Sequence, residues 1–156
     1  MSQTVSFFVY GTLKTGQCRE KYWPIRPLSV VPAWTFGQLY DLGSYPAMLL
    51  DQASLDGKVK ADRVAGQLWS FRQSDSSAVI QVLDRIECTN QAGYPNEYNR
   101  VEVSVTILAS GNRVSAQAYI YACAPQLRKT ARRVPAVQIR SGQFYAVWPE
   151  QPFWPD

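Results

Sequence analysis

The segment that most constrains the fold is residues 5–10, an apolar run with strand composition that ends abruptly at Gly11. Because glycine lacks a Cβ atom, the main chain can turn sharply there or lie directly against a ligand. In the second case the N–H groups of Gly11, Thr12 and Leu13 would face an anion or a carbonyl oxygen. A surface turn that closes a core strand explains the same pattern, so the segment alone does not decide between the two.

The rest of the chain is predicted to consist mostly of strands, since apolar and polar residues alternate in several places. Prolines at positions 24, 27 and 32 predict a loop over residues 15–32, and Asp56-Gly57 predicts a turn in a polar loop. A short basic helix is expected over residues 127–134, followed by a turn at residues 141–144. The predicted strands are residues 37–42, 47–50, 64–71, 101–107, 114–120 and 137–139.

One clear helix is predicted after Ser74 or Asp75, either of which can cap it. Its apolar face is formed at helical spacing by Ala78, Val79, Val82, Leu83 and Ile86. Glu87 falls beside Leu83 on the flank of this face, near the negative end of the helix dipole. Partial burial and the dipole would both raise the pKa of Glu87, toward the range useful for a general acid or base. An ordinary exposed glutamate at a helix end fits the sequence as well.

The length of 156 residues fits one domain, covering residues 1–156, with a tail rich in proline and aromatic residues from about residue 148. This tail is too apolar to be left in solvent, and we expect it to dock on the body of the protein or on a partner. Nothing in the sequence indicates a membrane span or an export signal. Three scattered cysteines favour a reducing, cytoplasmic location and argue against a disulfide framework or a zinc site.

The chain contains no histidine, which excludes a Ser-His-Asp triad, a Cys-His pair and the usual zinc, copper and non-haem iron sites. Acid-base chemistry near neutral pH must then use a carboxylate, lysine, tyrosine or thiol with a shifted pKa. The net charge of +4 favours anionic ligands only slightly. The basic residues between Arg128 and Arg133 are more typical of a solvated face than of a nucleic-acid site, because no aromatic residues are interleaved with them.

Five short motifs, in the same order and spacing, give the chain a resemblance to the gamma-glutamylcyclotransferase family, including its AIG2-like and gamma-glutamylamine cyclotransferase branches. The resemblance runs from about residue 5 to about residue 144. The motifs are Val9-Tyr10-Gly11-Thr12-Leu13 with Gly16, residues 37–43 with Tyr45-Pro46-Ala47, Leu83-Asp84-Arg85-Ile86-Glu87, Tyr98-Asn99-Arg100, and Ala118-Tyr119-Ile120-Tyr121.

The resemblance implies an α+β fold, a small mixed β-barrel with flanking helices, and conversion of a gamma-glutamyl amine or peptide to 5-oxoproline without metal or cofactor. In that reaction the substrate's own α-amine attacks its γ-carbonyl, so no protein nucleophile is needed. Glu87 matches the family's catalytic glutamate, and the Tyr10, Gly11, Thr12 and Leu13 main chain would hold the glutamyl oxygens. Tyr119 matches a position that lines the pocket. Tyr45, Tyr98 and Arg100 are further candidates for substrate binding, although Arg100 could instead pair with Glu102 or Asp84.

The chain departs from the resemblance at Cys88, where many family members have glycine. Cys88 could be a second nucleophile or a redox-sensitive thiol, or an inert buried side chain. Two other classes of function stay open: a binding module that kept the pocket without the chemistry, and a basic interaction domain that uses residues 128–133.

Overall fold

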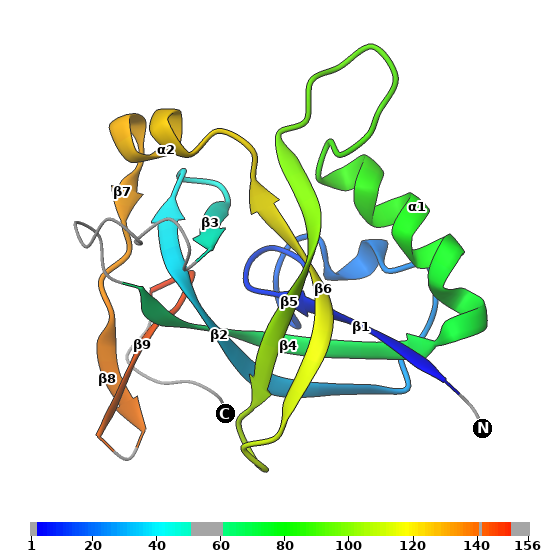
Figure 1. Cartoon of the computed structure of the whole chain (residues 1–156), viewed down its shortest axis with the longest axis horizontal. Coiled ribbons are helices and arrows are strands. Elements are labelled where there is room, and N and C mark those ends of the chain that lie inside the picture. Colours follow the sequence, from blue (N-terminus) through cyan, green and yellow to red (C-terminus); the bar gives the residue numbers. More distant parts are fainter. Residues whose placement is uncertain (1–2, 51–60, 141, 151–156) are drawn as a thin grey trace.

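Five strands form a closed β-barrel in this computed structural model, which describes residues 3–50, 61–140 and 142–150. The predicted turn at Asp56-Gly57 lies outside the described residues. Around the barrel, β2, β5, β6, β1 and β4 pair in sequence, and a long β4–β2 ladder closes the ring (Figure 1). All of these pairs are antiparallel except β1–β6. The barrel strands are β1 (Thr4–Val9), β2 (Ser29–Asp41), β4 (Asp62–Arg72), β5 (Tyr98–Ile107) and β6 (Arg113–Tyr121).

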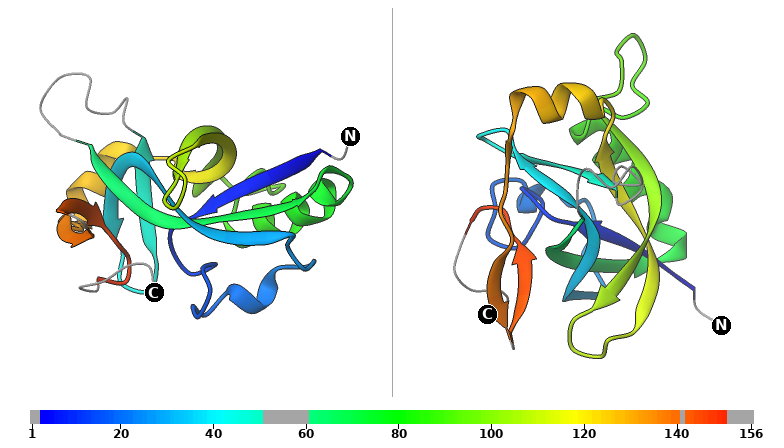
Figure 2. Two further views of the ribbon diagram at one scale, coloured as in Figure 1. Left: turned by 90° about the horizontal axis from the view of Figure 1, so that it is seen from below. Right: turned by 60° about the vertical axis from the view of Figure 1, so that its left-hand side comes forward.

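In the described part of the chain, four shorter strands and two α-helices accompany the barrel (Figures 1 and 2). The strand β3 (Pro46–Leu50) extends the sheet beyond β2, while β9 (Gln143–Ala146) pairs with β4 and carries β8 (Val137–Arg140) at the sheet edge. The helix α1 (Ser76–Ile86) lies on one side of the barrel, whereas α2 (Ala124–Thr130) and β7 (Arg132–Arg133) lie on the opposite side. The expected α+β class and mixed barrel are therefore confirmed.

Alternation along β1 divides its side chains between two apolar clusters. Phe8 packs inside the barrel with residues of the other four barrel strands. Phe7 and Val9 face outward and pack beneath α1 with Val79 and Leu83. Because both faces of its second half are buried, β1 ends in an apolar run, and the Gly11 segment that follows lines the same cavity as Glu87 at the end of α1.

Several elements begin earlier than the sequence predicted, among them β2 and α2. β2 starts at Ser29 and includes Pro32, a residue expected to belong to a loop. Proline lacks an N–H donor but keeps its acceptor, and the Pro32 carbonyl receives a hydrogen bond from Leu108 N–H (3.0 Å). α2 starts at Ala124 and has Pro125 in its first turn, where a missing N–H group costs nothing.

The start of α1 also differs from the prediction, because a short 3₁₀ turn, η3 (Gln73–Asp75), precedes it. Asp75 occupies the N-cap position but forms no capping hydrogen bond through its side chain. Ala78 is exposed, and the apolar face is made by Val79 and Leu83 with Ile80 and Ile86 beside them. The predicted helix is thus confirmed, with its apolar face rotated slightly.

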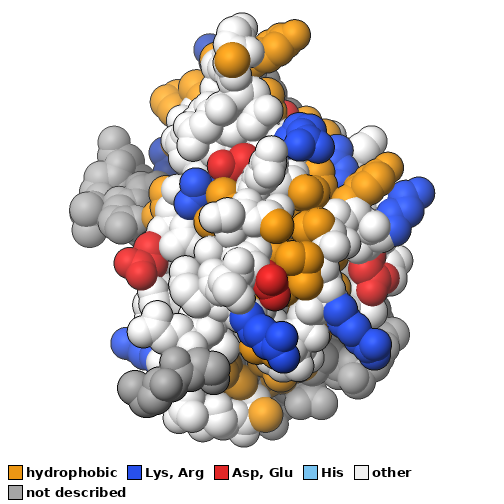
Figure 3. Space-filling model, turned by 90° about the vertical axis from the view of Figure 1, so that its right-hand side faces the viewer, with side chains coloured by type: hydrophobic (Ala, Val, Ile, Leu, Met, Phe, Trp, Pro, Cys, Tyr) orange, Lys and Arg blue, Asp and Glu red, His pale blue; other side chains and the backbone are white. Residues whose placement is uncertain are grey.

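The surface around α1 carries Lys and Arg side chains scattered among Asp and Glu, with no continuous patch of one sign (Figure 3). Within the described residues, no helix is both long enough and apolar enough to cross a membrane. The C-terminal segment docks on the body as far as it is described, since Trp148 is buried and its indole N–H donates to Asp41 Oδ1 (3.0 Å).

Candidate active site

A cavity opens where β1 ends. The segment after β1 forms one wall, the residue after α1 forms another, and tyrosines from β5 and β6 face them. The cavity is lined by Phe8, Val9, Tyr10, Gly11, Thr12, Leu13, Arg19, Tyr45, Pro46, Glu87, Tyr98 and Tyr119.

Three consecutive main-chain N–H groups in this wall, those of Gly11, Thr12 and Leu13, donate no hydrogen bond to any other described residue. Their carbonyls, by contrast, are all used: they accept from Lys14 N–H (3.1 Å), Arg19 N–H (2.9 Å) and the Trp23 indole (2.9 Å). The segment is buried, and buried N–H groups nearly always have a partner. A ligand with negatively charged or carbonyl oxygens would provide it.

Close packing explains why glycine stands at position 11. A Cβ atom there would lie 2.6 Å from Pro46 Cγ, closer than two carbon atoms can approach. The loop beyond is held by Trp23, which stacks on Trp69 with ring centroids 4.3 Å apart. The wall of N–H groups is therefore fixed on both sides by packing.

Glu87 is placed at the cavity by the way α1 ends. Cys88 N–H donates to Arg85 O (3.3 Å) and Thr89 N–H donates to Asp84 O (2.8 Å), the pair of bonds that defines a Schellman motif. Such a motif needs a left-handed residue directly after the C-cap, and Cys88 has φ 52°. Glu87 is the C-cap, so its side chain leaves the helix at the turn that faces the segment after β1.

Burial raises the pKa of Glu87 to about 7, against an ordinary value of 4.5. The positive charge of Arg19 opposes this rise in pKa, and the negative charge of Glu97 adds to it. No other described residue donates a hydrogen bond to the Glu87 carboxyl. A carboxyl group with this pKa exchanges a proton readily near neutral pH, as a general acid or base requires.

Three buried tyrosines close the inner end of the cavity. Tyr10 donates to Tyr119 O (2.6 Å), Tyr98 donates to Pro46 O (2.8 Å), and Tyr119 donates to Asp84 Oδ1 (2.6 Å). Burial raises the pKa of all three hydroxyls well above the ordinary value. They stay protonated near neutral pH and shape the cavity as neutral groups.

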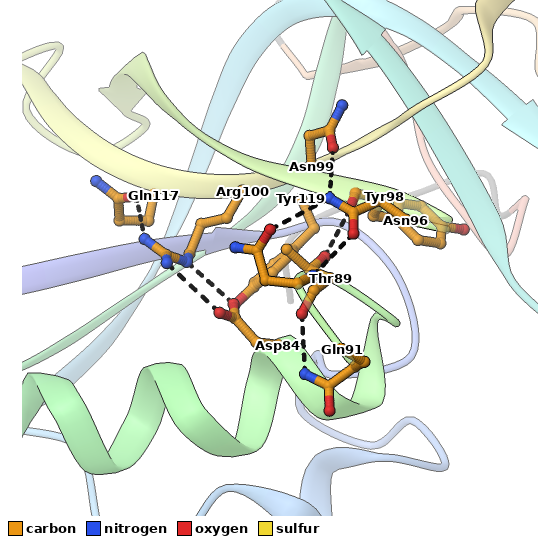
Figure 4. A network of polar contacts seen from close by, with 10 residues as sticks. Asp84, Thr89, Gln91, Asn96, Tyr98, Asn99, Arg100, Gln117 and Tyr119 are labelled. Atoms are coloured by element: carbon orange, nitrogen blue, oxygen red, sulfur yellow. Dashed lines mark hydrogen bonds and ion pairs between the residues drawn. The ribbon is translucent and has the colours of Figure 1, made fainter. Parts of the chain in front are cut away.

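A polar network behind the cavity joins α1 to the barrel (Figure 4). Asp84 forms an ion pair with Arg100 Nε (3.0 Å) and also accepts from the Tyr119 hydroxyl. One turn further on, Thr89 Oγ1 donates to Tyr98 O (2.6 Å). Helix and strands are thus fastened together on both sides of Glu87.

The outer end of the cavity is more polar and less buried. Tyr45 donates to Glu97 Oε2 (2.7 Å), and this bond, with partial burial, raises the pKa of Tyr45 to about 12. The positive charge of Arg19 opposes that rise, so Arg19 lies near Tyr45 as well as near Glu87.

The family model for gamma-glutamyl cyclotransferase, AIG2-like, matches residues 7–146. The chain belongs to this family. A search of curated proteins finds no match.

Solved structures of gamma-glutamyl cyclotransferases and AIG2-like proteins share the fold. An AIG2-like protein from Mus musculus has 24% identity and a TM-score of 0.53, over 81% of this chain and 83% of that one. An Arabidopsis thaliana protein has 22% identity and a TM-score of 0.55, over 81% and 68%. A gamma-glutamyl cyclotransferase specific to glutathione from yeast has 14% identity and a TM-score of 0.52, over 76% and 69%.

Eight of the nine site residues expected from the family resemblance line the cavity. The exception is Arg100, which takes the alternative role considered for it, an ion pair with Asp84. The contributions of Arg19 and Glu97 were missed, because these residues lie in loops without a local pattern. Their only sequence signal was closeness to the family motifs.

Two further features lie outside the cavity. Cys88 does not line it, and its thiol is near Pro95 O (3.8 Å). In the basic stretch, Arg132 pairs with Asp41 and with Glu150, and Arg133 pairs with Asp62. Much of this charge is thus neutralised within the fold. Among the described residues no group of acidic and cysteine side chains is arranged to hold a metal ion.

Proposed function

We propose that this member of the AIG2-like family converts a gamma-glutamyl amide, from an amine or a peptide, into 5-oxoproline and the free amine. The observation that carries the proposal is that three main-chain N–H groups and a carboxyl group of pKa about 7 lie across one cavity, and none of them has a hydrogen-bond partner among the described residues. The first are suited to hold the oxygens of a glutamyl group, and the second to move its ammonium proton.

In the proposed reaction Glu87, as a carboxylate, takes a proton from the substrate's α-ammonium group. The freed amine attacks the γ-carbonyl carbon, and the new C–N bond closes a five-membered ring. The amide C–N bond then breaks as Glu87 returns the proton to the departing nitrogen. The ring nitrogen loses its second proton to the released amine, by way of the same carboxylate, so that the amine leaves as an ammonium ion. Holding amine and carbonyl in contact can contribute up to about 7–11 kcal/mol in well-oriented intramolecular reactions, so a single acid-base group suffices.

The test is release of 5-oxoproline from a panel of gamma-glutamyl amines and peptides. Glu87→Gln should lower kcat about 100- to 10,000-fold, the usual contribution of a general acid-base group, while 5-oxoproline binding and folding are kept. Glu102→Gln is the matched control, because Glu102 is an exposed glutamate of β5 that does not line the cavity.

Two outcomes contradict the proposal in different ways. Unchanged turnover in Glu87→Gln removes the assigned role of the carboxyl group. Binding of 5-oxoproline without turnover of any substrate identifies the protein as a binding module instead.

A further inference from the structure

Among the described residues that line the cavity, Arg19 is the single Lys or Arg. Its main chain is tied to the cavity wall, since its N–H donates to Thr12 O (2.9 Å). Its guanidinium forms no ion pair or hydrogen bond with any described side chain. A half-buried guanidinium normally has an acidic partner, and its planar fork of donors matches a carboxylate.

The cavity has an inner and an outer end that differ in burial. At the inner end Tyr10, Thr12 and Tyr119 are each exposed by 6% or less. At the outer end Arg19 and Tyr45 are half-buried. Glu87 is also half-buried, and the charge of Arg19 acts on it and on Tyr45, so the guanidinium lies near both of these residues in the less buried part of the cavity.

This arrangement fixes which half of a substrate would meet Arg19, if the function proposed above holds. The glutamyl half has its oxygen partners at the inner wall, where three N–H groups are available. The scissile nitrogen must then lie within reach of Glu87. The amine half extends from there toward the opening, past the guanidinium.

We infer that Arg19 binds a carboxylate on the amine half of the substrate. The preferred substrates are then gamma-glutamyl amino acids and peptides with a carboxylate close to the scissile nitrogen, rather than gamma-glutamyl alkylamines. This makes Arg19 a specificity-determining residue, acting on the group that leaves.

The test compares two ligands that differ only in this charge, gamma-glutamylglycine and gamma-glutamylglycinamide, by titration calorimetry on Glu87→Gln, which keeps them intact. The carboxylate ligand should bind about tenfold or more tightly, in line with a charge-assisted pair. Adding Arg19→Gln should abolish the preference, and Arg19→Lys should keep part of it. Arg26→Gln is the control, because Arg26 is an exposed arginine of the same loop outside the cavity.

5-Oxoproline keeps the glutamyl carboxylate but has no amine half. Its binding therefore shows which of the two substrate carboxylates Arg19 contacts. Its affinity should be the same with and without Arg19→Gln. An equal loss for 5-oxoproline and gamma-glutamylglycine would assign Arg19 to the glutamyl carboxylate and overturn the inference. So would equal affinity for the two dipeptide ligands, or no binding of either.

The proposed function is judged separately, by 5-oxoproline release from the same two ligands with the wild-type protein. Turnover of both at equal kcat/KM keeps the function and rejects the inference. A tenfold binding preference lost in Arg19→Gln, without turnover of either ligand, keeps the recognition and rejects the chemistry.

Discussion

Asp84 and Glu87 lie three residues apart at the end of α1, yet their surroundings are opposite. Asp84 accepts hydrogen bonds from Arg100 and from the Tyr119 hydroxyl (Figure 4). The main-chain oxygen of Asp84 accepts from Thr89 N–H. Glu87 accepts none from any described side chain and lines the cavity.

The difference shows that one carboxylate attaches α1 to the barrel, while the other is left for acid-base chemistry. The carboxylate that joins α1 to β5 and β6 has every partner it needs, so it holds the helix end in place. The neighbouring carboxyl group accepts no hydrogen bond from any described residue, and burial is the largest cause of its pKa near 7. A group that must both take and give a proton requires this second environment.

Breaking the attachment of α1 to the barrel should have the largest effect on stability. Asp84→Asn leaves the partly buried Arg100 without its counter-charge, so we expect the free energy of unfolding to fall by about 1–3 kcal/mol. The value is measured by urea unfolding. Turnover should fall roughly tenfold or more, because Glu87 is then held less firmly, while the pH midpoint of the rate stays unchanged.

A double variant makes this prediction specific. Asp84→Asn with Arg100→Gln removes both charges and should recover part of the lost stability, since no uncompensated charge remains. Asp75→Asn, at the other end of α1 and without a capping bond, is the control. If the double variant is no more stable than Asp84→Asn alone, the ion pair is not what fastens the helix.

Much of the fold and of the site could be predicted, because the signals were local. Alternation marked most strands, helical spacing marked α1, and position on the helix placed Glu87 at the edge of its apolar face. The family motifs identified the segment from Tyr10 to Leu13. The early start of β2 was hidden, since Pro32 is a strong loop signal whose effect here is offset by pairing with β4.

Contacts between residues that lie far apart in the sequence could not be predicted. Lys14 is buried and donates to Trp148 O (2.6 Å), 134 residues away, a contact with no local pattern. Burial lowers the pKa of Lys14 to about 8. Arg19 is similar, because only the folded loop reveals that its side chain reaches the cavity.

The pH dependence of turnover tests whether Glu87, unlike Asp84, is the group that exchanges a proton. A general base with a raised pKa is lost by protonation as the pH falls through about 7, so kcat/KM should drop about tenfold per pH unit below that value. Glu97→Gln removes a charge that raises the pKa of Glu87 and should move the midpoint down. Arg19→Gln should move it up.

Full pH–rate profiles of the wild type and both variants check these directions. Glu102→Gln, which removes a negative charge outside the cavity, should leave the midpoint in place. A wild-type midpoint near 4.5 would mean that the titrating group is not a buried Glu87 carboxyl.

The smallest effect concerns the turn that separates Glu87 from the loop after it. Cys88 has φ 52°, a left-handed conformation that costs a residue with a Cβ about 1–2 kcal/mol and glycine almost nothing. After the entropy cost of glycine in the unfolded chain, Cys88→Gly should raise the free energy of unfolding by up to about 1 kcal/mol. Urea unfolding measures this gain, and turnover should be unchanged because Glu87 stays the C-cap.

Two variants isolate the backbone as the cause. Cys88→Ala removes the thiol but keeps the Cβ, so it should not be stabilising. Ala78→Gly, at an exposed position inside α1, should lower the free energy of unfolding by about 1 kcal/mol, the ordinary effect of glycine in a helix. If Cys88→Gly lowers the free energy of unfolding as Ala78→Gly does, the left-handed conformation of Cys88 does not destabilise the turn. The thiol would then stabilise the end of α1 by more than its 3.8 Å contact with Pro95 suggests.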